Sequence, residues 1–416
     1  MYRTELINYL GRLRNAKRYL EIGVGGEEQN FAQVECAHKV GVDPRPVTTF
    51  QGTSDDFFAQ NQDEFDIIFI DGLHTEEQVS RDIANAYRCL AKGGIIFLHD
   101  CMPPDAWHQR ELEAFQEGES WNGTVWKAAL REFNRATYKC TLLDMDWGCG
   151  LIDTAKTQVP VCRELPEELD YEQHYPWLLK YRTSVADYLR EQVKVFYHLA
   201  CMGNWQQVFV EQLEQLQQSG FYRIDLTVLG SDEDLRWAHS RCSEWNIWPN
   251  LVFHAPELTY FERPALLAIQ EYARQAEGYV LYLHSKGVSS PNDETKAKWR
   301  RLIMRELVEN WHSCVMQLPY YDLIGVNWRE MGPISHFCGN FWYASTRYLR
   351  TLADFQSYYD RPRYPIWDAV KDKRTGCEFW IGSGTEAPSL LSLVCRNVDF
   401  CDPAYWRSGA KNKRRR

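Results

Sequence analysis

The stretch "DIIFIDGLHTEEQVSRDIANAYRCLAKGGIIFLHDC", residues 66–101, decides the fold of the first part of this chain. It begins and ends with short apolar runs rich in isoleucine and phenylalanine, which are typical of buried strands. The segment between the runs places Val79, Ile83 and Ala86 on one face of a helix. A strand, a helix and a second strand in this order predict a parallel sheet covered by helices.

The same alternation extends outward over the first 155 or so residues, which we expect to form one α/β domain, 1–155. Strands are predicted at 18–24, 38–43, 65–72, 94–100, 139–144 and 149–154, and helices near 28–37 and 75–91.

A change of composition marks the join between two halves. Residues 156–190 are rich in proline and glutamate and contain no clear strand, so we interpret them as a linker with a helix. A second alternating series follows and predicts another α/β domain over 191–410. Its strands are expected at 192–202, 223–231, 249–256, 278–287 and 322–328, and its helices at 205–220, 262–276 and 295–317.

Bulk composition limits the class of protein. A chain of 416 residues exceeds one ordinary core, and 44% hydrophobic with 25% charged residues fits a globular enzyme. No apolar run approaches a membrane span, so we expect a cytoplasmic protein with no membrane span. The net charge of −10 argues against a nucleic-acid partner, and the scattered cysteines suggest reduced thiols. The oligomeric state is not determined by these numbers.

A glycine-rich turn follows the first predicted strand, in "YLEIGVGGEEQNF" at 19–31. Glu21 ends the strand, and Gly23 and Gly25 precede the helix expected near 28–37. Glycines at such a turn let the backbone approach a ligand closely, while a helix N-terminus offers free N–H groups. An ordinary turn explains this motif equally well, so the residue at the end of the next strand is needed to indicate whether a ligand binds here.

That next strand ends in Asp43, which lies 22 residues after Glu21. An acidic side chain at this strand end can accept the hydroxyl hydrogens of a ribose. Thr53, Ser54 and Asp55 follow and are candidates to meet an adenine edge. Together these residues predict a cofactor that contains a nucleoside.

Residues 18–153 resemble the class I S-adenosylmethionine-dependent methyltransferases, whose E/D-x-G-x-G loop corresponds to Glu21–Gly25. The resemblance is to the sugar and small-molecule O-methyltransferase branch, through "IDGLH" at 70–74 and "LHDCMP" at 98–103. It implies a Rossmann-like sheet, S-adenosylmethionine as cofactor, and a lid or substrate-side role for "WNGTVWKAALRE" at 121–132. Glu27 replaces the third glycine of the full dinucleotide motif, which suits a cofactor without phosphates.

Two acidic residues and two histidines follow the third and fourth predicted strands. Asp71 and Asp100 are expected at one sheet edge, where hard oxygen ligands can hold Mg²⁺ beside the cofactor. His74 or His99 is then the general base for a sugar hydroxyl. His99 directly precedes Asp100, but strand alternation would turn these side chains apart and favours His74. Both histidines are kept as candidates, and metal dependence is implied by the resemblance.

Each of these assignments also has a purely structural alternative. Asp71 and Asp100 would then only cap loops and hold the cofactor, and each histidine would be an ordinary hydrogen-bonding side chain at a strand end.

The second half resembles the GT-A type of nucleotide-sugar glycosyltransferase, and a branch of polysaccharide-biosynthesis proteins carries "LHSKG" as at 283–287. The strand before it does not end in the metal-binding Asp-x-Asp of that type. His284 and Lys286 are instead expected to neutralise a diphosphate leaving group, with Glu378 as base. Trp342 and Trp380 are candidates to stack on sugar rings.

Each of these residues also has a structural interpretation. The His284–Lys286 segment would be a plain turn, Glu378 a salt-bridge partner, and the tryptophans core residues.

We therefore expect a methyltransferase that acts on a sugar hydroxyl, fused to a glycosyltransferase-type domain, with a glycan acceptor and a nucleotide-sugar as partners. The alternative is a methyltransferase of a non-sugar small molecule with a glycan-binding second domain that has no chemistry of its own. Turnover of a nucleotide-sugar separates the two.

Overall fold

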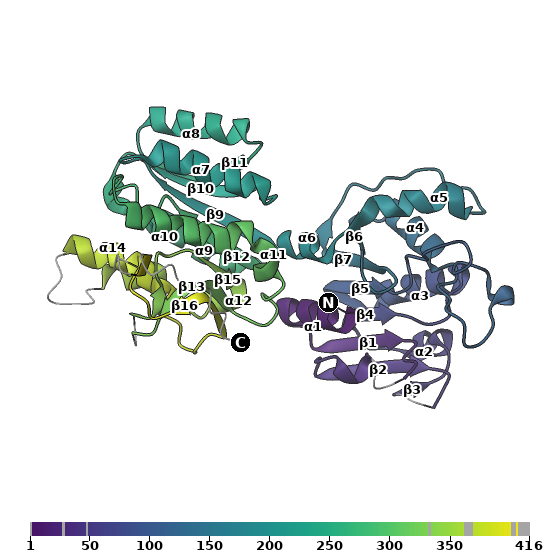
Figure 1. The fold of residues 1–416 in the computed structure, drawn as a ribbon. Helices are drawn as coiled ribbons and strands as arrows, with labels where there is room; N and C mark the ends of the chain where they lie inside the picture. Colours follow the sequence, from purple (N-terminus) through teal and green to yellow (C-terminus); the bar gives the residue numbers. More distant parts are fainter. Residues whose placement is uncertain are drawn as a thin grey trace. The chain divides into compact units, whose positions relative to one another are not determined.

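The computed structural model describes residues 2–26, 30–46, 49–331, 334–361, 369–400 and 405–406. The chain forms two compact units that divide between Tyr188 and Leu189, and each is built on one large mixed sheet with helices (Figure 1). The α/β fold class predicted for both halves is confirmed.

The described residues of the first unit form eight strands in the order β3-β2-β1-β4-β5-β7-β6-β8. Strands β1 to β5 are parallel to one another, whereas β7 is antiparallel to both β5 and β6. Their bounds are β1 Arg18–Ile22, β2 His38–Asp43, β3 Phe50–Gln51, β4 Phe65–Ile70, β5 Leu90–Leu98, β6 Tyr138–Leu143, β7 Cys149–Thr157 and β8 Arg182–Thr183. Because the parallel strands end at one edge of the sheet, the residues that follow them meet there.

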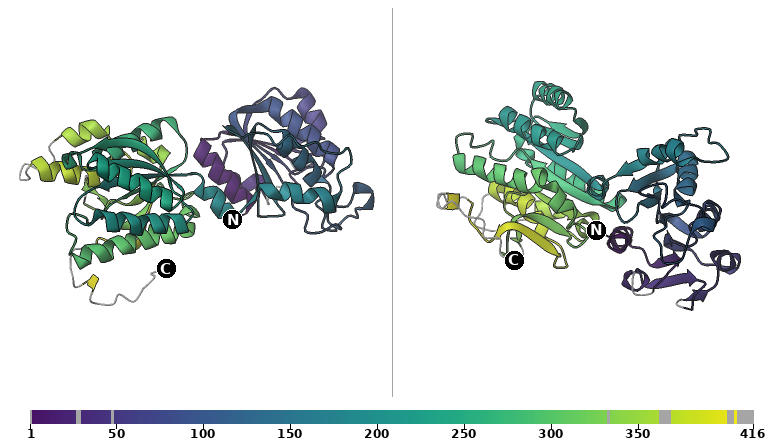
Figure 2. Two further views of the ribbon diagram at one scale, coloured as in Figure 1. Left: turned by 90° about the horizontal axis from the view of Figure 1, so that it is seen from above. Right: turned by 45° about the vertical axis from the view of Figure 1, so that its right-hand side comes forward.

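Helices cover both faces of this sheet (Figure 2). They are α1 Arg3–Arg14, α2 Ser54–Gln60, α3 Glu76–Cys89, α4 Val125–Arg135, α5 Tyr171–Leu178 and, at the unit boundary, α6 Val185–Arg190. Ile68 and Ile70 of β4 share a core with Ile83 of α3. Ile67 points to the other face, where it lies beside Gly11 of α1. This alternation follows from the two-residue period of a strand, and it buries the apolar run at 65–70 on both faces.

The helix expected near 28–37 is not formed over its described part. Residues 30–37 contain only a 3₁₀ turn, Phe31–Gln33, after which Val34 is extended. Residues 27–29, including Glu27, lie outside the described residues. The N–H groups of an α-helix are therefore not available at 30–37, and ligand binding at this turn relies on the glycine backbone and on side chains.

Residues 156–190, expected to be a linker, belong almost entirely to the first unit. Leu169, Tyr175 and Leu178 are buried in its core cluster, and β8 pairs with β6. The polar composition of the segment concealed this, because a few apolar residues at helical spacing are sufficient to fix α5 on α4.

The second unit has a sheet in the order β11-β10-β9-β12-β15-β13-β14, with β16 beside β13. Its strands are β9 Val193–Ala200, β10 Arg223–Leu229, β11 Trp248–Ala255, β12 Tyr279–His284, β13 Leu323–Arg329, β14 His336–Phe337, β15 Trp342–Ser345 and β16 Leu390–Arg396. Strands β9 to β12 are parallel, whereas β15 is antiparallel to β12 and β13. The ends of the parallel strands again converge at one edge.

The helices of the second unit are α7 Trp205–Gln218, α8 Asp232–Glu244, α9 Arg263–Gln275, α10 Glu294–Met304, α11 Trp311–Val315, α12 Thr346–Leu349, α13 Phe355–Asp360 and α14 Ala369–Phe379. The helix predicted at 295–317 is interrupted by a π-helical segment, Arg305–Glu309, between α10 and α11. In the described part of the chain, no helix has the length and apolar character needed to cross a membrane.

Candidate active site

A cavity of about 660 Å³ opens in the first unit at the edge where β1, β2, β4 and β5 end. The sequence-predicted residues that line it are Glu21, Gly23, Gly25, Asp43, Thr53, Ser54, Asp71, His74, His99 and Asp100. The fold therefore brings nearly all of the predicted first-half site into one place.

The turn after β1 depends on glycine at position 23. Gly23 has φ +83°, and a Cβ added there would collide with the backbone oxygen of Asp71. The Gly23 N–H donates to Val42 O at 2.8 Å. A side chain would separate this turn from the loop after β4, so glycine is required for the two loops to meet.

Asp43 ends β2 and is 3% exposed. Its carboxylate accepts hydrogen bonds from the backbone N–H of Gly25 at 3.0 Å and of Arg45 at 2.8 Å. Burial raises the pKa of Asp43, but the hydrogen bonds from Arg45 and Gly25 bring it below its ordinary value. Asp43 is thus held as an ionised acceptor at the wall of the cavity, as recognition of ribose hydroxyls requires.

Glu21 is buried at the end of β1, where it accepts hydrogen bonds from Tyr19 Oη at 2.6 Å and Asn30 Nδ2 at 3.0 Å. Burial raises the pKa of Glu21 to about 7, although both hydrogen bonds favour the charged form. Near neutral pH this carboxyl is therefore divided between its two protonation states.

Ser54 and Asp55 differ in their position relative to the cavity. Ser54 lines the cavity and accepts a hydrogen bond from Gln78 Nε2 at 3.0 Å. Asp55 is exposed outside the lining residues, and its carboxylate lies 3.4 Å from Arg81 Nε. The two are adjacent on α2, and a helix turns successive side chains by about 100°. Asp55 therefore lies outside the lining of the cavity, unlike its neighbour Ser54, and its contact with the cofactor stays a prediction.

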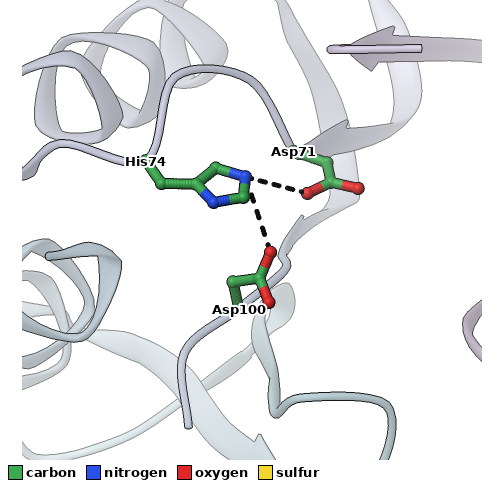
Figure 3. A group of neighbouring side chains, drawn as sticks. All are labelled: Asp71, His74 and Asp100. Atoms are coloured by element: carbon green, nitrogen blue, oxygen red, sulfur yellow. Dashed lines mark ion pairs between the residues drawn. The ribbon is translucent and has the colours of Figure 1, made fainter. Parts of the chain in front are cut away.

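Asp71, His74 and Asp100 converge in the cavity (Figure 3). His74 Nε2 lies 3.4 Å from Asp71 Oδ1 and 3.5 Å from Asp100 Oδ2. One ligand atom from each residue lies within 4.8 Å of the others, and no other group of three or more such residues is found among those described. Two carboxylates that point at one small volume fit a divalent cation, and their hard oxygens suit Mg²⁺.

The contact made by Nδ1 determines the tautomer of His74. Nδ1 lies 3.1 Å from the backbone oxygen of Trp121, which can only accept, so Nδ1 carries a hydrogen. Burial lowers the pKa of His74, but Asp71 and Asp100 raise it above its ordinary value. Nε2, which faces the two carboxylates, is consequently the nitrogen that gains and loses a proton.

His99 faces the same two carboxylates. Its Nδ1 lies 3.1 Å from Asp71 Oδ1 and 3.0 Å from Asp100 Oδ2, while Nε2 lies 2.9 Å from Arg3 Nη1. Burial lowers the pKa of His99, but the charge of Asp71 and hydrogen bonds to Asp100 and Asp146 raise it well above its ordinary value. In either protonation state Nδ1 keeps its hydrogen, because two acceptors face it.

The expectation that His99 and Asp100 turn apart is wrong. Strand β5 ends at Leu98, and Asp100 has φ +58°, in the left-handed region. The alternation of a strand therefore no longer applies, and both side chains turn to the same side.

Several contacting residues were not predicted as site residues. Arg3 of α1 donates to Asp146 at 3.0 Å and contacts His99. Asn122 donates to Asp100 Oδ1 at 2.8 Å, and the ring of Trp121 stacks on His74 with centroids 5.4 Å apart. The Trp-Asn-Gly motif within 121–132 signalled the last two residues, whereas no local pattern distinguished Arg3 or Asp146.

The second unit has a cavity of about 580 Å³, lined by the predicted residues His284, Lys286 and Glu378. Glu378 is buried and accepts a hydrogen bond from the Gly339 N–H at 2.8 Å. Burial raises the pKa of Glu378, but Lys286, His336 and the Gly339 N–H bring it below its ordinary value. Lys286 Nζ lies 3.9 Å from the ring centroid of Trp299.

His284 cannot supply the predicted positive charge in this state. Burial and the nearby Lys286 lower its pKa to about 3, and Nε2 lies 2.8 Å from the Gly339 oxygen. It is a neutral hydrogen-bond donor at neutral pH.

The stacking role predicted for Trp342 and Trp380 is also wrong for this structure, because both side chains are 0% exposed. Their indole N–H groups donate inside the core, to Asn340 Oδ1 and Ala353 O respectively. Neither indole lines the cavity, whereas Trp299 and Glu262, which the sequence did not single out, do.

Comparisons with known proteins agree with the division into two units. Residues 13–101 match the family Methyltransf_24, described as a methyltransferase domain. Residues 195–381 match DUF8361, described as a domain of unknown function. No curated protein matches the chain. The first unit thus carries a methyltransferase domain of Rossmann-like fold.

Solved structures give partial likenesses. An O-methyltransferase from Klebsiella pneumoniae, described as putative, shares 17% identity over 36% of this chain and 78% of its own, with TM-score 0.28. MycE, from the mycinamycin biosynthetic pathway in complex with Mg, SAH and mycinamycin VI, shares 18% over 36% and 47%, with TM-score 0.25. S. aureus TarS 1–349 shares 13% over 48% and 58%, with TM-score 0.27. The chain spans about half the length of MycE, and likenesses at these scores do not bear on function.

Proposed function

We propose that the first unit is an S-adenosylmethionine-dependent O-methyltransferase that acts on a sugar hydroxyl with the help of Mg²⁺. The observation that carries this proposal is the presence, in one cavity, of two features. The glycine turn and Asp43 suit a nucleoside, and the group of Asp71, His74 and Asp100 suits activation of a hydroxyl.

Each residue has a role in this proposal. Asp43 accepts hydrogen bonds from the ribose hydroxyls, and Asp71 and Asp100 are the oxygen ligands that would hold the cation. A bound divalent cation lowers the pKa of a hydroxyl that it coordinates. His74 Nε2 takes the hydroxyl proton while the oxygen–methyl bond forms and the methyl–sulfur bond breaks. His99 orients both carboxylates, because its Nδ1 faces Asp71 and Asp100 together.

Calorimetric titration of S-adenosylmethionine tests the cofactor site. Asp43→Ala is expected to weaken binding roughly 10- to 100-fold, because hydrogen bonds to a charged group are worth about 1.5–3 kcal/mol each. Asp55→Ala is the matched control, since Asp55 lies outside the lining of the cavity. Wild-type protein that does not bind the cofactor would contradict the proposal.

Titration of Mg²⁺ tests the second feature. Asp71→Asn and Asp100→Asn are each expected to abolish cation binding while cofactor affinity changes little. Transfer of labelled methyl to methyl glycosides, compared with catechols, then separates a sugar acceptor from another small-molecule hydroxyl. Methylation of catechols alone would favour the non-sugar alternative.

A second candidate function concerns the second unit, for which we propose a nucleotide-sugar site of glycosyltransferase type. It is favoured by the position of Lys286 and Glu378 in one cavity, where a fixed cation and an ionised carboxylate suit a diphosphate and an acceptor hydroxyl. Release of UDP from UDP-sugars should be lost in Lys286→Ala and Glu378→Gln. Oligosaccharide binding without turnover of any nucleotide-sugar would favour a non-catalytic glycan-binding domain.

A further inference from the structure

The first unit has another cavity, of about 420 Å³, that no part of the proposed mechanism uses. It lies among residues 102–104 after β5, residues 144–148 between β6 and β7, and the segment around α5 and β8. We call it the turn groove. Its lining includes Met102, Asp144, Asp146, Trp147, Gly148 and Arg182.

An exposed indole lies in the lining of this groove. Trp147 is 45% exposed, although the backbone around it is fixed. Its oxygen accepts a hydrogen bond from the Met102 N–H at 2.8 Å, and a Cβ added to Gly148 would collide with Met102 Cβ. A large aromatic side chain that is left in water on a well-anchored backbone is characteristic of a binding surface.

Carboxylates stand beside this indole in the lining of the groove. Asp144 pairs with Arg182 at 2.6 Å, and Asp146 pairs with Arg3 at 3.0 Å. The charge of each carboxylate is therefore balanced by a guanidinium, while its remaining lone pairs can accept hydrogen bonds from hydroxyl groups. A flat apolar ring next to hydroxyl acceptors matches the two sides of a sugar, whose C–H face is apolar and whose edge carries hydroxyls.

The groove also lies close to the proposed reacting group. Asp146 Oδ2 is 3.8 Å from His99 Nε2, and His99 Nδ1 is 3.1 Å from Asp71 Oδ1. Asp146 lines the turn groove, whereas His99 and Asp71 line the cavity of about 660 Å³ in which methyl transfer is proposed. One pair of side chains therefore connects the two cavities.

The aromatic surface continues beyond the groove. The ring of His108 lies 5.7 Å from that of Trp147 and 4.9 Å from that of Trp107, which is 49% exposed. The guanidinium of Arg110 lies 3.7 Å from the Trp107 ring centroid. The rings of Trp147, His108 and Trp107 thus follow one another along this surface.

We propose that the turn groove binds a neutral sugar ring of the acceptor, with its apolar face stacked on Trp147 and its hydroxyls directed to Asp144 and Asp146. The inference rests on the proposed methyl transfer and names the acceptor subsite for it. Its volume of about 420 Å³ falls within the range of roughly 300–1,000 Å³ found for small-molecule sites.

Fluorine NMR of the full chain labelled with 5-fluorotryptophan tests the groove without any need for activity. Trp147→Phe identifies the Trp147 resonance as the one that disappears. Neutral methyl hexosides at millimolar concentrations should shift this resonance. They should leave that of Trp248, an indole with 73% exposure in the second unit, unchanged. Trp248→Phe assigns the control signal.

The kinetic constants for the acceptor that is methylated most efficiently provide a second test. Trp147→Ala should raise KM about three- to tenfold with kcat and cofactor affinity little changed, as expected for one stacked ring. Trp248→Ala should change neither constant.

The outcomes distinguish this inference from the proposed function. Wild type that does not bind S-adenosylmethionine defeats the methyltransferase proposal and, with it, the acceptor role of the groove. If the protein binds the cofactor and transfers methyl, but no hexoside shifts the Trp147 resonance, the assignment of the groove is wrong and the methyltransferase proposal stands. A shift produced by catechol and not by hexosides also overturns the sugar assignment.

Discussion

Asp100 shows how one backbone angle sets the chemistry of this site. With φ +58° it leaves the strand geometry of β5, so its carboxylate and the imidazole of His99 lie on the same side, 3.0 Å apart. Asp71 and His74 approach the same point from the loop after β4. Four side chains, Asp71, His74, His99 and Asp100, thereby share one small volume, and the two carboxylates favour the protonated form of both imidazoles.

The buried carboxyl of Glu21 should make the stability of the first unit depend on pH. Its folded-state pKa of about 7 lies above the ordinary value of 4.5, so the folded state binds more protons between these values. Stability is then present below about pH 4.5 and is lost as pH rises through about 7. The loss is on the order of 3 kcal/mol.

Glu21→Gln removes this titration, so calorimetric thermal unfolding of the variant should show a smaller decrease in Tm from pH 5 to pH 8 than wild type. Glu77→Gln, which changes an exposed side chain, is the control and should behave like wild type. An equal decrease in Glu21→Gln and wild type would show that Glu21 does not titrate in this range.

The two histidines should differ in kinetics. His74→Gln is expected to lower kcat about 100-fold or more with unchanged cofactor affinity, because it removes the nitrogen that accepts the proton. His99→Gln should have a smaller effect on kcat, since its Nδ1 keeps a hydrogen in both protonation states. The reverse order of the two kcat values would assign the base to His99.

At the scale of elements, the segment 121–124 holds the histidine loop in place. Trp121 O fixes the tautomer of His74, and the Thr124 N–H donates to His74 O at 2.8 Å. Thr75 then caps α3 by accepting a hydrogen bond from the Gln78 N–H at 3.3 Å. The position of His74 is thus set jointly by the start of α3 and by a segment 47 residues away in the chain.

Gly123 provides a matched test of this arrangement. It has φ +59°, and an added Cβ would collide with His74 O; Gly118 has φ +93° with nothing within 4 Å. Gly118→Ala should cost only about 1 kcal/mol of backbone strain in denaturant unfolding. Gly123→Ala should additionally displace the His74 loop and weaken Mg²⁺ binding in calorimetry. Equal effects of the two variants would contradict the role given to this segment.

At the scale of the whole molecule, each unit has a core of its own. One cluster joins β1, β4 and β5 to α3, α4 and α5, and another joins β9, β12 and β15 to α9, α12 and α13. The boundary at 188/189 places α5 and β8 with the first unit. Each of the two cavities with candidate chemistry is therefore lined by residues of a single unit.

A fragment of residues 1–188 should consequently fold alone and bind S-adenosylmethionine with nearly the affinity of the full chain. Circular dichroism and calorimetry on the fragment check this prediction. A fragment of residues 1–155, which lacks α5 and β8, is the comparison and should be markedly less stable, because Leu169, Tyr175 and Leu178 leave the core. Equal stability of the two fragments would contradict the boundary.

Local patterns in the sequence were sufficient to predict the two α/β units, strands β1, β2, β4, β5, β6 and β7, and about half of the residues that line the first cavity. Strand periodicity and glycine turns are local signals, and parallel strands bring the residues at their ends to one edge whatever the details of packing. For this reason the sequence predicts Glu21, Asp43, Asp71 and Asp100 at a common edge of the sheet.

Which side chains take part, and in which protonation state, depends instead on tertiary contacts. The left-handed angle of Asp100, the Arg3–Asp146 pair beside His99 and the burial of Trp342 and Trp380 all depend on contacts between residues distant in sequence. Exposure and pKa follow from the packing around a side chain, and a linear pattern does not contain that packing.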